Sequence, residues 1–155
     1  MSKDRMATHQ WDSSFDPEIV PLFLGLQWAQ ARSIDSMKPM LLKHGLSLAE
    51  FDVLATLRNA PAPHQMTPKE IQDEVVITSG GLTKVMLQLE SRELVKRVKI
   101  ESDLRVKPVG LTPKGRKIIE KAMEELVAFT RGWIREFLNP AEINRLTTLL
   151  GKLAK

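Results

Sequence analysis

The chain lacks cysteine entirely among its 155 residues. This absence excludes disulfide bonds, thiolate metal ligands and any sensing of oxidants through a thiol. The three histidines, His9, His44 and His64, are too widely separated for the short spacing of a histidine metal site. We therefore expect no metal and no cofactor.

Long apolar runs and catalytic motifs are missing as well. No segment approaches the eighteen or so uncharged apolar residues of a membrane span, and residues 1–10 have no apolar core of the signal-peptide kind. We expect a cytoplasmic protein without a membrane partner. The sequence has no glycine-rich phosphate loop, no paired histidine–glutamate metal motif and no nucleophile elbow, so we expect no enzyme.

The composition that remains is typical of one globular domain, with 43% hydrophobic and 27% charged residues. The net charge is +4, and its distribution is uneven. Residues 78–117 contain ten basic and four acidic side chains, a balance of +6, so the rest of the chain sums to −2. This concentration of positive charge favours a polyanionic partner.

Two helices are predicted in the first part of the chain. Asp16, followed by proline, begins a long amphipathic helix that ends near Gly45. Its length exceeds what a small domain needs for its own core, which suggests packing against a second chain. Ser47 and Glu50 have the spacing of a capping box and begin a second helix, which Pro61 ends. Residues 59–66 are interpreted as a plain connector.

A pair of short helices follows. Thr67, Pro68 and Glu70 combine an N-cap, a first-turn proline and a capping glutamate, which predicts a helix to about residue 76. Thr78 or Ser79 is expected to cap the next helix after a tight turn. The glycines at positions 80 and 81 have two open explanations: close approach of backbone amides to a phosphate, or the tight turn itself.

A basic hairpin is predicted next, from strands at 94–100 and 104–111 joined by a turn at 101–103. Pro108 cannot donate to a strand ladder, so the second strand is expected to be an edge or to become irregular there. Thr112-Pro113 then begins an amphipathic helix, Asn139-Pro140 ends it, and a last amphipathic helix follows. The order predicts a mainly α fold with a small β-hairpin wing, a winged helix-turn-helix that binds DNA.

Short motifs in this order resemble those of MarR-type transcriptional regulators: Thr83-Lys84, Leu89-Glu90, and residues 94–97, 103–105 and 111–115. The resemblance extends from Asp16 to the C-terminus. It implies a homodimer, joined by its terminal helices, that places two winged lobes on a pseudo-palindromic operator as a ligand-responsive repressor. One domain over 1–155 would then comprise a DNA-binding lobe at 47–115 and dimerisation helices at 16–45 and 116–155.

The resemblance also implies roles for single residues. Arg105 would enter the minor groove and Asp103 would hold the wing in shape. The reading helix and the lysines would contact bases and phosphates. The candidate DNA-binding residues are Thr78, Ser79, Gly80, Thr83, Lys84, Gln88, Arg97, Arg105 and Lys107.

Two positions depart from the family pattern. Glu93 stands where relatives often have glycine at the end of the recognition helix, so we expect that helix to end differently here. Leu104 precedes Arg105 where many relatives have two arginines, which should weaken the hold of the wing on phosphate. The alternative to DNA binding is a non-catalytic helical adaptor that uses the winged fold to bind proteins.

A finer resemblance is to the urate-responsive PecS and HucR branch, through Gln10-Trp11 and residues 50–54 and 78–83. It implies that Trp11 and Asp52 contact a small-molecule effector, an anionic aromatic compound, with Trp28 and Arg32 as further candidates. Val85 stands where that branch has an arginine, which argues against urate itself. The alternative is that the tryptophans pack in the core and that Asp52 is a solvated helix residue.

Overall fold

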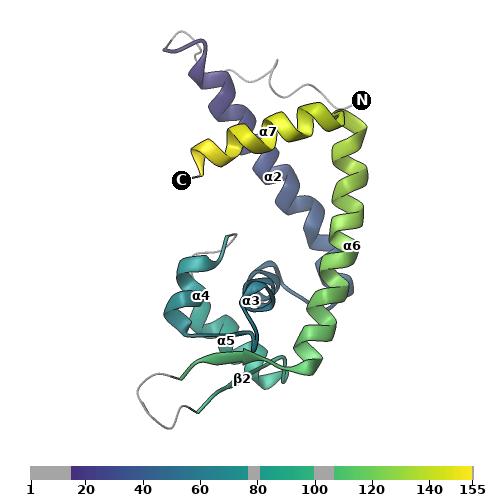
Figure 1. Ribbon diagram of the computed structural model, residues 1–155. Helices are drawn as coiled ribbons and strands as arrows, with labels where there is room; N and C mark the ends of the chain where they lie inside the picture. Colours follow the sequence, from purple (N-terminus) through teal and green to yellow (C-terminus); the bar gives the residue numbers. More distant parts are fainter. Residues whose placement is uncertain (1–14, 77–80, 100–106, 155) are drawn as a thin grey trace. The chain divides into compact units, whose positions relative to one another are not determined.

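The computed structural model of the chain describes residues 15–76, 81–99 and 107–154 (Figure 1). Within these ranges it contains six helices and one three-stranded antiparallel sheet, so the predicted fold class is confirmed. The chain divides into two compact units, residues 1–39 and 40–155. Among the described residues, no helix is both long and apolar enough to cross a membrane.

The helix α2, Ile19–Lys43, contributes most of its length to the first unit. The carboxylate of Asp16 accepts hydrogen bonds from the backbone N–H groups of Glu18 (3.0 Å) and Ile19 (2.9 Å), which satisfies two unpaired donors of the first turn. After the last turn, Gly45 adopts a left-handed conformation with φ of +65°. Both predicted ends of this helix are therefore confirmed.

The helices α3 (Leu48–Asn59) and α4 (Pro68–Glu74) begin as predicted, each with a complete capping box. The hydroxyl groups of Ser47 and Thr67 accept the N–H three residues ahead, and the glutamate side chain at that position accepts the N–H of the capping residue. These signals were readable from sequence because every partner lies within one helical turn.

The helix α5, the predicted recognition helix, spans Leu82–Ser91, and its expected cap is wrong. Gly81 occupies the N-cap position with φ of +71°, and it makes no side-chain cap hydrogen bond. A β-carbon at Gly81 would meet nothing within 4 Å, so the left-handed backbone alone favours glycine here. This geometry supports the turn explanation for Gly81. Thr78 and Ser79 lie outside the described residues.

The sheet has the strand order β1-β3-β2, formed by β1 (Gln65–Met66), β2 (Val95–Arg97) and β3 (Val109–Leu111). Both pairings are antiparallel, with Gly110 opposite Gln65 on one side and opposite Lys96 on the other. The interpretation of residues 59–66 as a plain connector is therefore wrong. A two-residue strand has no periodicity to read, and β1 is defined only by its pairing with β3.

Of the two alternatives expected for the second hairpin strand, the edge position is wrong and the irregular backbone at Pro108 is confirmed. β3 is the central strand of the sheet and not an edge. Pro108 stands immediately before this strand, where its missing N–H costs no ladder bond, and its carbonyl accepts the N–H of Val98 at 2.8 Å. The predicted turn at 101–103 lies outside the described residues.

The chain ends in α6 (Pro113–Phe137) and α7 (Pro140–Leu153), as predicted. Thr112 and Asn139 cap them through bonds to the backbone N–H three residues ahead. A β-carbon at Gly115 would lie 2.0 Å from the carbonyl oxygen of Leu94. Only glycine therefore lets the first turn of α6 lie against the backbone that leads into β2.

The core of the second unit surrounds α3, which contacts α4, α5, α6 and β3 (Figure 1). The side chains that pack there come from every one of these elements, and each is almost completely buried: Leu54, Leu57, Ile71, Leu89, Val109 and Ile119. This packing holds α5 against α3 with its opposite face turned outward.

Candidate nucleic-acid interface

The helix α5 presents one polar face and buries the other. Val85, Met86 and Leu89 are buried against the core. At about 100° per residue, the exposed positions cover an arc of roughly 140° on the opposite side. We call this arc the reading face, and it consists of Thr83, Lys84, Leu87, Gln88 and Ser91.

Three of the predicted DNA-binding residues, Thr83, Lys84 and Gln88, lie together on the reading face. Arg97 and Lys107 are also exposed, at the base of the wing. The remaining candidates lie outside the described residues: Thr78, Ser79, Gly80 and Arg105. DNA contact stays a prediction for all nine.

Sequence reasoning missed two members of the reading face, Leu87 and Ser91. The signal was present, because Leu87 follows Thr83 by four residues and falls off the apolar stripe that carries Val85 and Leu89. An isolated leucine inside an apolar pattern is easily assigned to the core by residue type alone. Its exposed fraction of 58% shows that it belongs to the outer surface.

The end of α5 resembles the glycine type despite having no glycine. Glu93 adopts a left-handed conformation with φ of +58°. The N–H of Leu94 donates to the carbonyl of Leu89 (3.0 Å), and the N–H of Glu93 donates to that of Glu90 (2.9 Å), which together form a Schellman motif. We expected the helix to end differently without glycine, but it does not. Glu93 adopts the left-handed conformation itself, with a backbone strain that glycine would not have.

An ion pair between Arg92 and Glu50 ties the end of α5 to the start of α3. Arg92 Nη1 donates to Glu50 Oε1 at 2.8 Å, and the other oxygen of Glu50 accepts the backbone N–H of Ser47 at 2.8 Å. Glu50 is only 7% exposed, so these partners replace the water that would otherwise solvate its carboxylate. The Nζ of Lys114 also donates to the Arg92 carbonyl at 2.9 Å. The orientation of the reading face is therefore tied to two neighbouring helices.

A second ion pair connects α5 with the wing. Arg97 Nε on β2 donates to the carboxylate of Glu90. A guanidinium has five N–H donors in a planar fork, so this bond leaves the chemistry for a phosphate contact in place. The pair positions the base of the wing beside the reading helix.

Asp52 is buried, with an exposed fraction of 4%, so the alternative that it is a solvated helix residue is wrong. Its Oδ1 accepts the backbone N–H of Val76 at 3.2 Å. Val76 follows α4, and so Asp52 joins the middle of α3 to the turn of the helix-turn-helix. This positioning role is a function of Asp52 that the sequence did not indicate.

The other ligand candidates lie elsewhere. Trp28, half-buried, and Arg32, exposed, are on α2 in the first unit, and Trp11 lies outside the described residues. A ligand role stays a prediction for these three and for Asp52.

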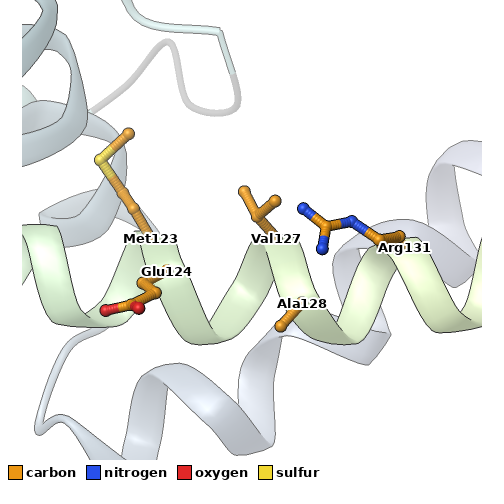
Figure 2. Close-up of a pocket in the computed structure, with 5 residues that line it drawn as sticks. All are labelled: Met123, Glu124, Val127, Ala128 and Arg131. Carbon is orange, nitrogen blue, oxygen red and sulfur yellow. The ribbon is translucent and has the colours of Figure 1, made fainter.

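A hollow of about 400 Å³ lies along α6 and is lined by Met123, Glu124, Val127, Ala128 and Arg131. Figure 2 shows Met123 and Val127 projecting from one side of the helix, with the guanidinium of Arg131 reaching toward Val127. The hollow therefore combines apolar surface with one cation, Arg131, and one carboxylate, Glu124. Of the predicted ligand residues, the three that the structure describes, Trp28, Arg32 and Asp52, do not line it.

Two carboxylates attach α6 to its neighbours in the second unit. Glu120 accepts hydrogen bonds from Arg116 (2.9 Å) and from Arg58 of α3 (2.6 Å), and these bonds hold its pKa below the ordinary value of 4.5. Glu125 lies 3.0 Å from both Lys43 Nζ and His44 Nε2, and these bonds likewise lower its pKa.

Comparison with known proteins agrees with this geometry. The MarR family pattern matches residues 46–107. The helix-turn-helix transcriptional regulator PecS of Dickeya dadantii (strain 3937) is 35% identical over 113 residues, which cover 73% of this chain and 68% of PecS.

Two solved structures are also similar. A mutant of E. coli MarR complexed with operator DNA matches with a TM-score of 0.76 and 25% identity, over 89% of this chain and 96% of that one. NadR in complex with 4-hydroxyphenylacetate matches with a TM-score of 0.68 and 25% identity, over 85% and 91%. With its outward-facing recognition helix and adjoining wing, the chain belongs to the MarR family of DNA-binding transcriptional regulators and is not an enzyme.

Proposed function

We propose that the protein is a homodimeric repressor that binds a pseudo-palindromic operator and releases it when a small molecule binds. The observation that carries this proposal is the reading face of α5, held outward by a buried core and by the Arg92–Glu50 ion pair. The similarity to MarR bound to operator DNA supports the same docking. Operator binding would place the protein in the cytoplasm.

In this arrangement α5 enters the major groove and the wing reaches the neighbouring minor groove. Thr83, Lys84 and Gln88 would meet bases and phosphates, together with Thr78, Ser79 and Gly80, which precede α5 in the sequence. Arg97 and Lys107 would contact the backbone, and Arg105 would read the width of the minor groove.

The exposed apolar side chains of the C-terminal helices support a dimer. α7 has no buried residue, although short amphipathic helices owe most of their stability to tertiary packing. Large apolar side chains on α6 and α7 are at least one-third exposed: Phe129, Phe137, Leu146, Leu149, Leu150 and Leu153. A second copy of the chain would cover them and place two reading faces about one DNA turn apart, roughly 10 base pairs.

A small effector with an aromatic ring and a negative charge suits the hollow along α6. Met123 and Val127 offer apolar contact and Arg131 offers a cation. The similarity to NadR with bound 4-hydroxyphenylacetate supports this ligand class. A ligand that binds more tightly when the two lobes are out of register with DNA must weaken operator binding. It lowers the affinity for the operator by the same factor by which the operator lowers the affinity for the ligand.

Salt-dependent DNA binding tests this proposal. The purified protein should elute as a dimer, select specific duplexes from genomic fragments, and lose affinity linearly in a plot of log affinity against log salt. Replacing Lys84 with alanine should reduce the magnitude of that slope by about 1, since one phosphate contact is lost. The matched control is Lys152→Ala on α7, which should leave the slope unchanged. A monomer, or a protein that ignores duplex DNA at low salt, would contradict the proposal and favour the adaptor.

A further inference from the structure

Leu87 lies within the reading face and off the buried side of α5. Leu87 is 58% exposed, while the buried side of α5 is completed by Val85, Met86 and Leu89. Thr83 and Ser91, one turn before and one turn after Leu87, are both exposed. Leu87 therefore lies inside the surface that would face DNA.

Exposure alone would not assign a role, because single exposed leucines are common on protein surfaces. Its neighbours decide the matter. The other four members of the reading face carry a hydroxyl, an ammonium or an amide group, and each of these can hydrogen-bond to a base edge or a phosphate. Leu87 is the one apolar side chain among these five residues.

The major groove offers one apolar feature, the C5 methyl group of thymine. A leucine cannot donate or accept a hydrogen bond, so it would leave a polar base edge unpaired wherever it covered one. Contact with a thymine methyl removes apolar surface of both partners from water without that cost.

We propose that Leu87 is a specificity-determining residue that reads a thymine methyl group in each operator half-site. This inference rests on the proposed docking of α5 in the major groove. Two-fold symmetry places the preferred thymine at a pair of symmetry-related positions. Burial of one methyl-sized group predicts a preference of about three- to fivefold for each half-site.

The test compares thymine with uracil, which differ only by this methyl group. The purified full chain selects duplexes from a library with a random central segment, prepared once with thymine and once with uracil. The wild type should enrich one symmetric pair of thymines from the first library and lose the preference at that pair in the second. Leu87→Ala should lose it in both libraries while retaining the preferences at other positions.

The matched control is Leu42→Ala, which makes the same change at an exposed leucine of α2 (77% exposed), outside the reading face, and should keep the thymine preference. Leu87 contributes little to the core, so Leu87→Ala should melt at the wild-type temperature. Failure of the wild type to enrich any sequence would overturn the proposed function. An unchanged motif with Leu87→Ala, or equal wild-type selection from both libraries, would overturn only the assignment of Leu87.

Discussion

Removing the guanidinium of Arg92 should destabilise the protein more than any change to its exposed ion pairs. Loss of one partner from a fully buried pair costs about 3–5 kcal/mol, because the remaining charge is left uncompensated. Glu50 has a side-chain exposure of 9%, but Arg92 has one of 36%, so water partly replaces the lost partner. Glu50 also keeps its bond from the Ser47 N–H. We therefore expect Arg92→Ala to lower the free energy of unfolding by about 2 kcal/mol.

The assay is urea unfolding followed by circular dichroism, with all variants at one protein concentration because a dimer's stability depends on concentration. The control is Lys69→Ala, since the pair of Lys69 with Asp73 is 86% and 61% exposed. It should change stability by less than about 0.5 kcal/mol. A loss below this same limit for Arg92→Ala would refute the argument that the ion pair fixes α5 on α3.

The predicted coupling is specific to Glu50. Glu50→Gln keeps an acceptor for the Ser47 N–H but removes the charge that Arg92 contacts. The double variant should therefore lose much less unfolding free energy than the sum of the losses in the two single variants. Additive losses would indicate that Arg92 stabilises the lobe through packing of its side chain alone.

Four further predictions concern stability. Glu93→Gly should raise the free energy of unfolding by about 0.5–1 kcal/mol, since glycine adopts the left-handed conformation without strain, and thermal melting measures the gain. Gly115→Ala should cost about 3 kcal/mol or more because its β-carbon would meet a backbone oxygen at 2.0 Å. Gly132→Ala, with nothing within 4 Å, should stabilise α6 by up to about 1 kcal/mol. The pKa values of Glu120 and Glu125 are lower in the folded protein than the ordinary value of 4.5. Their contribution to the free energy of unfolding should therefore be fully present above pH 4.5 and be lost as the pH falls through these lowered pKa values.

Each of these predictions has a clear opposite. A less stable Glu93→Gly variant would show that the Glu93 side chain itself holds the helix end. Equal effects of alanine at positions 115 and 132 would rule out the close backbone contact. If the variant with glutamine at both 120 and 125 keeps the full acid dependence of the wild type, other carboxylates are responsible for it.

Helix starts could be predicted from the sequence because their determinants are local. Asp16, Ser47, Thr67 and Thr112 each bond a backbone N–H within three residues, so residue type and spacing suffice. The one failure, at α5, came from competing local signals. The hydroxyl residues at 78 and 79 suggested a cap, whereas the left-handed backbone of Gly81 precedes the observed helix.

The candidate site was only partly predictable. Thr83, Lys84 and Gln88 followed from helical spacing and charge, which depend on one element alone. Helical spacing also indicated the exposure of Leu87, because Leu87 lies off the stripe that carries Val85 and Leu89, but its residue type alone gives no such signal. Only the packing of α5 on α3 decides which face is buried.

The sequence by itself determined the helices, their order and the basic character of the winged lobe. The tertiary structure decided the β1–β3 pairing, the contact of Gly115 with Leu94 and the bond between Glu50 and Arg92, which are 42 residues apart. Short-range hydrogen bonds are set by spacing along the chain. Contacts between distant residues form only when several elements pack together, and no pattern within one segment records which partner will be met.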